Sequence, residues 1–275
     1  MLVLIINLGT APVHPRILLR PTFRTNLRTI HPDAGSNRIS TYVKLFQPKR
    51  AFGLPNPSAF CVKLETYLRM TGISYELGVG DPREAPKGKV PWIDDDGLVL
   101  GDSALIIDYL KQKHGDPLDG RLTPKQQATG HVIQKMLEDS LYFVASHAKW
   151  VDDEGFAIYS AELFAGMPPE QLEYVPPMVR KRAIEKLNAQ GIARHSRDEI
   201  HTLGIRDVQA FGELLGTGPY LFGDQPTSFD ASAFGVIGNI KDGPFLSPVR
   251  DRINDTRNIA KYIDRIRQEY FADLI

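Results

Sequence analysis

Between residues 41 and 114 the spacing of hydrophobic positions changes period several times. Residues 41–47, "TYVKLFQ", alternate between two faces, which predicts a strand. From residue 59 to residue 70, hydrophobic side chains recur every three or four positions, which predicts a helix. Gly72 suits the left-handed cap at its end.

The remainder of this segment predicts three more strands and a second helix. Residues 73–79 predict a strand, and residues 90–100 predict two short strands around the turn "DDDG". Residues 102–114 then show helical spacing as far as Gly115. The order strand, helix, strand, strand, strand, helix predicts a small mixed sheet covered by helices.

After residue 124 the strand signals become sparse and helical spacing dominates. The expected helices cover residues 125–150, 177–201, 203–216, 228–240 and 256–272. The predicted fold class is therefore α/β plus all-α. Its domains are an α/β domain at 41–114, a linker at 115–124 and an all-helical domain at 125–275.

Composition and charge narrow the function classes. The 275 residues are 42% hydrophobic, and 33 basic residues balance 33 acidic ones, so nucleic acid is not an expected partner. The longest apolar run, at residues 1–6, is too short for a transmembrane segment. The single cysteine excludes an internal disulfide and is compatible with a reducing compartment, so we expect a cytoplasmic protein.

Residues 1–40 differ from the rest of the chain. They carry five arginines and one aspartate, a formal charge of +4, together with several prolines. One interpretation is an organelle-targeting segment, including a mitochondrial one; the other is a disordered tail, because the prolines would interrupt a targeting helix. We expect residues 1–38 to contribute nothing to the stability of the fold.

The first candidate for chemistry lies at the start of the helix at 59–70. Ser58 and Cys61 stand three apart there, as in a thioredoxin-type redox motif whose leading sulfur is replaced. A helix start favours a bound anion, so Ser58 could activate the thiolate of another molecule, or it could simply cap the helix. Cys61 is either a reactive thiol or a buried apolar residue.

Two further segments suggest a ligand rather than a disulfide. In "KVPWI", a cis Pro91 at a strand start would leave the backbone of Val90 free to pair with an extended ligand; a trans proline would not. In "GDSA", Asp102 and Ser103 either cap a helix or bind the charged end of an α-amino acid. Together the three segments suit a tripeptide that carries a thiol.

These motifs resemble those of glutathione S-transferases. The resemblance rests on "PSAFC", "KVPWI", "GDSALIIDYL" and "TSFDASAFG", where Thr227 and Asp230 have the spacing of a capping box. It covers nearly all of residues 41–272. Within that superfamily, "GLPNPSAFCVKLETYLRMTGISYE" is most similar to the branch of failed axon connections and the metaxins.

The resemblance implies a thioredoxin-like domain followed by a helical one, and glutathione as co-substrate without a metal. It implies Ser58 as the catalytic residue, Val90 and Pro91 at the cysteinyl unit, Asp102 and Ser103 at the γ-glutamyl end, and Lys89 at the glycine carboxylate. The implied reaction joins glutathione to a small apolar electrophile, and a homodimer is a further expectation. We expect the electrophile to contact Tyr142, Phe143, His147 and Trp150.

Two features leave another function open. The long loop "PKRAFGLPNP" departs from the common transferase pattern, and an insertion there would move Ser58 away from the thiol. Relatives of the metaxin type suggest a non-catalytic interaction module that keeps the fold. Fold alone does not decide between an enzyme and such a module.

Overall fold

A computed structural model describes residues 42–274 of the chain. The expectations for residues 1–40 lie outside the described residues. Within this range, residues 42–274 belong to one compact unit.

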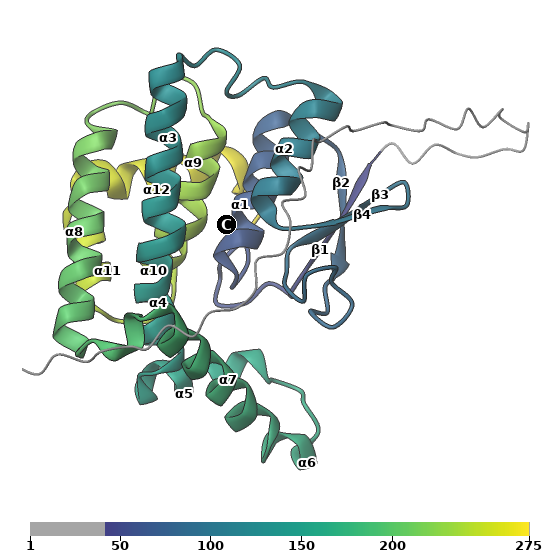
Figure 1. The fold of residues 1–275 in the computed structure, drawn as a ribbon, viewed down its shortest axis with the longest axis vertical. Helices are drawn as coiled ribbons and strands as arrows, with labels where there is room; N and C mark the ends of the chain where they lie inside the picture. The colour runs from purple at the N-terminus through teal and green to yellow at the C-terminus, as the bar shows by residue number, and fades with distance from the viewer. Residues whose placement is uncertain (1–41, 275) are drawn as a thin grey trace, which may run out of the picture. The chain divides into compact units, whose positions relative to one another are not determined.

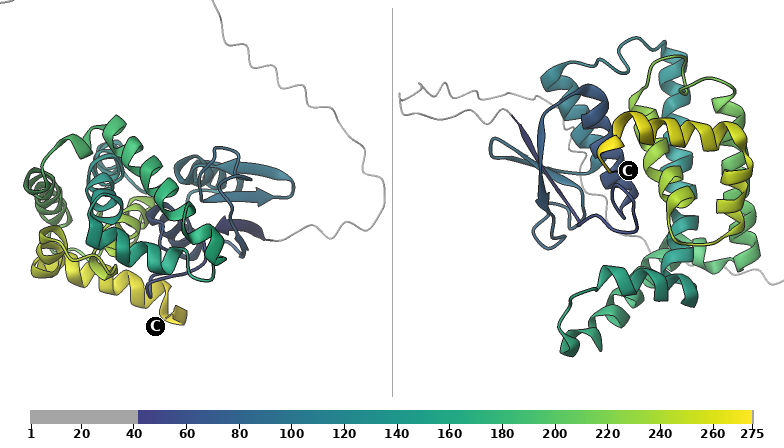
Figure 2. Two further views of the ribbon diagram at one scale, coloured as in Figure 1. Left: turned by 90° about the horizontal axis from the view of Figure 1, so that it is seen from below. Right: turned by 180° about the vertical axis from the view of Figure 1, so that it is seen from behind.

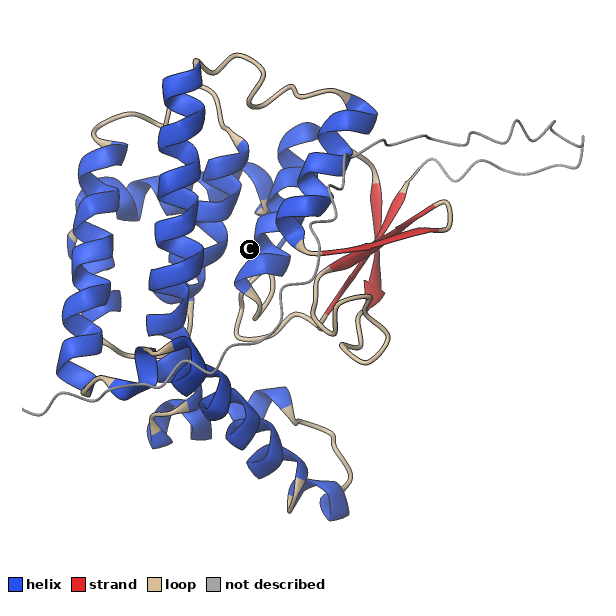
Figure 3. Cartoon of the chain, in the orientation of Figure 1, coloured by secondary structure: helices blue, strands red, loops and turns tan. Residues whose placement is uncertain are grey.

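The sheet is built from four strands in the order β2-β1-β3-β4. Its strands are β1 (Val43–Gln47), β2 (Tyr75–Val79), β3 (Trp92–Asp95) and β4 (Leu98–Gly101). β1 pairs in parallel with β2 and antiparallel with β3, and β3 pairs antiparallel with β4. The predicted mixed sheet is confirmed, and Figure 3 shows its strands in red.

Two helices follow the strands where the hydrophobic spacing predicts them. They are α1 (Ala59–Thr71) and α2 (Ser103–His114), and Figure 1 shows both on the side of the sheet that faces the other helices. α1 ends at Gly72, whose φ of 68° lies in the left-handed region that glycine adopts without steric cost. The helices and the sheet share one buried core, which includes Leu45, Leu64, Ile93 and Leu110.

The rest of the described chain is helical. It contains α3 (Pro124–Met136), the π-helical turn η1 (Leu137–Leu141), α4 (Tyr142–Trp150), α5 (Asp153–Leu163), α6 (Pro169–Leu172), α7 (Val175–Gln190), η2 (Ile192–Arg194), α8 (Arg197–Leu215), α9 (Ser228–Ala233), η3 (Phe234–Gly238), α10 (Asn239–Asp242), α11 (Pro248–Asp255), α12 (Arg257–Tyr270) and η4 (Ala272–Leu274). No strand of the sheet follows Gly101 in the described residues. The predicted fold class is confirmed, whereas the exact limits of the domains and the linker stay a prediction.

Three details of the helical half differ from the sequence expectation. The helix expected at 177–201 is two helices, because Gly191 ends α7 with a φ of 116° and Ser196 starts α8 with a capping box. The helices at 153–172 were not expected, and neither was α11. These segments are short or largely exposed, so their hydrophobic spacing is weak.

The capping box at the start of α9 is confirmed. The carboxylate of Asp230 accepts hydrogen bonds from the Thr227 amide at 2.7 Å and from the Thr227 hydroxyl at 2.6 Å. It also accepts one from the Tyr262 hydroxyl at 2.8 Å, so the buried cap connects α9 to α12.

α1 belongs to both halves of the fold. Ala59 and Val62 pack in the core of the helical half, while Leu64 and Leu68 pack in the core of the sheet. A Cβ atom on Gly235 would lie 2.5 Å from the Ala59 carbonyl oxygen, so η3 lies directly against the first turn of α1. This contact fixes the start of α1 against the helical half.

Figure 2 shows α12 from behind and from below, ending beside α1. No helix in residues 42–274 is long and apolar enough to cross a membrane.

Candidate active site

Strand register brings three of the predicted site segments to one edge of the sheet. Phe46 at the end of β1 lies opposite Trp92 at the start of β3, and Trp92 lies opposite Gly101 at the end of β4. The chain therefore enters β3 through Pro91, and leaves β4 into Asp102, on the edge where β1 leads toward Ser58. Residues far apart in the sequence are neighbours through this topology.

Ser58 lies at the N-cap position of α1 with extended backbone angles, φ −98° and ψ 117°. Ser58 therefore occupies the capping position, but its side chain makes no capping hydrogen bond. The side chain is half-buried and borders a cavity. A hydroxyl at a helix start, not used for capping, can donate a hydrogen bond to an anion there.

Cys61 is fully buried one turn into α1. Burial raises the pKa of its thiol to about 12, and the nearby Ser58 hydroxyl only partly opposes this shift. A thiol with this pKa is protonated at neutral pH and is a poor nucleophile. The interpretation of Cys61 as a buried apolar residue is supported.

The long loop before Ser58 is held in place by hydrogen bonds. The Asn56 amide donates to the Pro48 carbonyl at 2.8 Å, and its oxygen accepts from the Ser58 amide at 3.0 Å. The Asn239 side chain donates to the Asn56 carbonyl at 3.1 Å, and Arg267 donates to Gly53 at 2.6 Å. The loop is thus attached to both α10 and α12.

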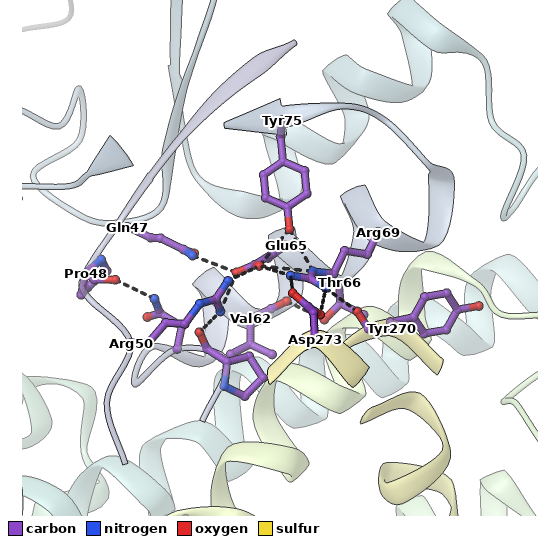
Figure 4. Close-up of polar contacts among 12 residues, drawn as sticks. Gln47, Pro48, Arg50, Val62, Glu65, Thr66, Arg69, Tyr75, Tyr270 and Asp273 are labelled. Atoms are coloured by element: carbon purple, nitrogen blue, oxygen red, sulfur yellow. Dashed lines mark hydrogen bonds and ion pairs between the residues drawn. The ribbon is translucent and has the colours of Figure 1, made fainter. Parts of the chain in front are cut away.

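A buried carboxylate attaches the same loop to α1. Figure 4 shows the side chains that converge on Glu65, whose carboxylate accepts from Arg50 at 2.6 Å and from Gln47 at 2.8 Å. Arg69, one turn further along α1, also contacts Glu65 at 3.1 Å and pairs with Asp273 at 2.6 Å. This cluster therefore joins the loop, α1 and the C-terminal turn, so the insertion does not leave Ser58 on an unsupported segment.

The peptide bond between Val90 and Pro91 is cis, in agreement with the resemblance. Pro91 is buried and Val90 is half-buried, whereas Lys89 is exposed. No backbone hydrogen bond to the Val90 amide or carbonyl is formed within residues 42–274. The backbone of Val90 thus keeps the unpaired groups that an extended ligand would need.

Asp102 and Ser103 open α2. One oxygen of the Asp102 carboxylate, Oδ1, accepts from the Ala104 amide at 3.0 Å and the Leu105 amide at 3.3 Å, so the helix-cap interpretation holds for Asp102. The φ of Asp102 is 87°, an unfavourable conformation for a residue with a Cβ atom. Ser103 is buried, while Asp102 is exposed and keeps Oδ2 free of these capping contacts.

A cavity of about 150 Å³ lies between the start of α1 and the helical half. It is bordered by Phe52, Leu54, Pro57, Ser58, Ala59, Tyr142, Ala145, Ser146, Ala148, Lys149, Trp150, Tyr159, Val236, Asn239, Ile240, Phe245 and Ser247. Of the residues predicted to activate or bind glutathione, only Ser58 borders it. Lys89, Val90, Pro91, Asp102 and Ser103 lie outside this cavity, at the edge of the sheet described above.

The expected contacts from α4 are partly wrong. Tyr142 and Trp150 border the cavity, but Phe143 and His147 do not. The face of α4 that borders the cavity carries Tyr142, Ala145, Ser146 and Lys149, three or four residues apart as on one side of a helix. Phe143 and His147 lie off this face. His147 instead lies 3.7 Å from Asp152.

Sequence reasoning missed Lys149 and the aromatic rings around it. The Lys149 ammonium lies 4.6 Å from the ring centroid of Tyr159, and burial lowers the pKa of Lys149 to about 8. Burial also raises the pKa of the phenols of Tyr142 and Tyr159, so both stay protonated hydroxyls at neutral pH. The spacing of Tyr142 and Lys149, seven residues apart in an expected helix, was the available signal.

No group of three or more histidine, cysteine, aspartate or glutamate side chains in residues 42–274 is arranged to hold a metal ion. The residues that border the cavity offer hydroxyls, the Asn239 amide and one amine, that of Lys149.

Two protein-family models and one relative show the family of this chain. The model of the glutathione S-transferase N-terminal domain matches residues 59–155, and that of the C-terminal domain matches residues 204–266. The chain is 32% identical to an isoprene-epoxide–glutathione S-transferase of Rhodococcus sp. (strain AD45), over 80% of this chain and 95% of that protein. The chain belongs to the glutathione S-transferase superfamily.

Other members extend the comparison. The chain is 31% identical to Failed axon connections of Drosophila melanogaster, over 84% of this chain and 58% of that protein. It is 24% identical to Metaxin-2 of Mus musculus, over 80% and 85% of the two chains. The expected place in the superfamily, close to failed axon connections and the metaxins, is confirmed.

Solved structures show the same fold. A glutathione S-transferase of Methylobacterium radiotolerans in complex with glutathione sulfonate has a TM-score of 0.54 and 21% identity, covering 86% of this chain and 95% of that one.

Proposed function

We propose that this protein conjugates glutathione to a small, apolar electrophile. The observation that carries the proposal is the position of Ser58. Its side chain makes no capping bond, lies at the start of α1 and borders a cavity with aromatic walls. A helix start stabilises a thiolate, and an apolar cavity accommodates the molecule that the thiolate attacks.

Each predicted residue has a role in this proposal. Ser58 donates a hydrogen bond to the glutathione sulfur and so favours its thiolate form. The backbone of Val90, before the cis Pro91, pairs with the cysteinyl unit. Asp102 and Ser103 bind the γ-glutamyl end, and Lys89 binds the glycine carboxylate.

In this proposal the two halves of the chain bind different substrates. Residues 41–114 form the glutathione-binding domain, residues 115–124 the linker, and residues 125–275 the domain that contacts the electrophile. The aromatic side chains at the cavity come mainly from the helical half, and Ser58 comes from the other. The Rhodococcus relative is named for an isoprene epoxide, which is a small electrophile of the proposed kind.

Two variants test the assignment of Ser58. A hydrogen bond to a charged group contributes about 1.5–3 kcal/mol, and about 1.4 kcal/mol corresponds to a tenfold change in rate. Ser58→Ala should therefore lower kcat/KM by roughly 10- to 100-fold with 1-chloro-2,4-dinitrobenzene as the electrophile. Cys61→Ala should keep most of the activity, because its thiol is protonated and buried. If Ser58→Ala kept the activity of the parent and Cys61→Ala were inactive, Cys61 rather than Ser58 would be the catalytic residue.

A non-catalytic interaction module is the second candidate. It is favoured by the 31% identity to Failed axon connections and by the match to Metaxin-2. Under this function the fold would present a surface to another protein, and residues 58, 90 and 103 would bind no glutathione. Absence of both glutathione binding and conjugation in the full chain would select it.

We place the proposed enzyme in the cytoplasm, where thiols are kept reduced, and expect a homodimer. The free Cys61 thiol is compatible with that compartment. Sedimentation of the purified chain tests the dimer, and fractionation of the cells that make the protein tests the location.

A further inference from the structure

Lys149 is half-buried and differs from other lysines of the described chain that are buried or half-buried. Lys63 pairs with Glu138 at 2.6 Å, and Lys111 pairs with Asp119. Lys149 forms no ion pair with any residue in 42–274; its ammonium donates to the Pro57 carbonyl at 3.3 Å. Even partial removal of an ammonium from water is unfavourable without a carboxylate partner, so Lys149 contributes little to stability at this position beside the cavity.

Aromatic rings form the other contacts of Lys149. Its Nζ lies 4.6 Å from the ring centroid of Tyr159 and 5.7 Å from that of Phe245. Such contacts stabilise a cation weakly and leave its N–H groups available for donation. Lys149 and Ser58 border the same cavity, so a molecule attacked by a thiolate at Ser58 would lie within reach of the amine.

The groups around Lys149 leave its charge uncompensated. Tyr142 on the same helix and Tyr159 on α5 are protonated phenols, because burial raises the pKa of each. Cys61 on α1 is a protonated thiol. On α7, Arg180 donates to the carbonyls of Trp150 and Val151 and pairs with Asp153 of α5 at 2.7 Å, so this carboxylate already has another cation as its partner. α10 contributes Asn239 and Ile240 to the cavity and the N-cap of α11 contributes Ser247, none of them charged.

We propose that Lys149 is the general acid of the conjugation reaction and that the substrates are epoxides, whose opening leaves a negatively charged oxygen on the product. This inference rests on the proposed function and specifies its substrate class. An ammonium in an apolar cavity is suited to this role, because it meets the charge only as it develops.

The step balances without a further reactant. The glutathione thiolate forms an S–C bond with one epoxide carbon, and the C–O bond of that carbon breaks with its electron pair on oxygen. The Lys149 ammonium transfers a proton to this oxygen, which yields a β-hydroxy thioether. The neutral amine then takes up a proton from water; burial lowers the pKa of Lys149 to about 8, which allows both forms near neutral pH.

The test compares two electrophiles on the full-length protein. Styrene oxide requires a proton on its oxygen, whereas 1-chloro-2,4-dinitrobenzene loses chloride and requires none. Lys149→Met should lower kcat with styrene oxide by roughly 100-fold or more, in the range typical of general acids, and should lower the ratio of kcat with styrene oxide to kcat with 1-chloro-2,4-dinitrobenzene by roughly 30-fold or more. The control Lys186→Met, at an exposed position on α7, should leave both rates unchanged.

The pH profile gives a second readout that does not depend on a variant. With styrene oxide, kcat of the parent should fall as the pH rises through about 8, because the ammonium loses its proton. No such fall in kcat is expected with 1-chloro-2,4-dinitrobenzene. A profile for styrene oxide without this fall would overturn the proposal even if Lys149→Met did not fold.

The other outcomes are distinct. Three outcomes would overturn the role of Lys149 and leave the proposed function intact. Lys149→Met could lose the same activity with both electrophiles, or it could lose none with styrene oxide. The parent could also conjugate 1-chloro-2,4-dinitrobenzene but not styrene oxide. A parent that neither binds glutathione nor conjugates either electrophile would overturn both.

Discussion

Replacing Glu65 with alanine should markedly destabilise the protein. The Glu65 carboxylate is fully buried and accepts hydrogen bonds from Gln47, Arg50, Arg69 and Tyr75. Removing one partner of a buried ion pair costs about 3–5 kcal/mol, because the remaining charges and donors are left unpaired.

The structure favours the lower part of that range. Arg69 keeps its contact with Asp273, and the Arg50 side chain is 29% exposed, so water can reach it after the substitution. We therefore expect a loss of about 3 kcal/mol in the free energy of unfolding. At about 2–4 °C per kcal/mol for a chain of this size, the Tm should fall by roughly 6–12 °C.

Urea unfolding followed by circular dichroism measures this loss. Glu65→Gln, which keeps the shape but removes the charge, should lie between the parent and Glu65→Ala. The control Glu213→Ala, at an exposed position of α8, should change stability by no more than about 0.5 kcal/mol. If Glu65→Ala were no more destabilising than Glu213→Ala, the cluster would not hold the loop as described.

Two other predictions concern packing and pH. Gly235→Ala should cost about 1–3 kcal/mol in urea unfolding, because the new Cβ would lie 2.5 Å from the Ala59 carbonyl oxygen; an unchanged midpoint would contradict the close contact. Burial lowers the pKa of His147, so the folded protein favours its neutral form, and the stability this gives is present above the unfolded pKa of about 6.5 and is lost as the pH falls. His147→Gln should therefore lose less stability than the parent between pH 7.5 and pH 5.5, and equal losses would refute this.

Local patterns were sufficient to predict the elements around the sheet. The alternation in β1, the spacing of α1 and the turn chemistry before β4 each act over a few residues, and all three are present in the structure. Short helices such as α6 and α11 were not predicted, because they bury few residues and their hydrophobic positions show little helical spacing.

The site was harder to predict because it depends on distant contacts. The positions of Ser58 and Pro91 followed from recognisable motifs. Whether Phe143 or Lys149 borders the cavity depends on which face α4 turns toward it, and only the packing of the helical half determines that. The contacts of Glu65 with Arg50 and of Arg69 with Asp273 join segments whose proximity no local pattern indicates.

Isothermal titration calorimetry of the full chain with glutathione tests the central claim most directly. The account predicts binding with a Kd in the micromolar to millimolar range, retained in Ser58→Ala because Val90, Asp102 and Ser103 still hold the rest of the ligand. Absence of binding heat, at several temperatures and at millimolar glutathione, would contradict the account and favour an interaction module.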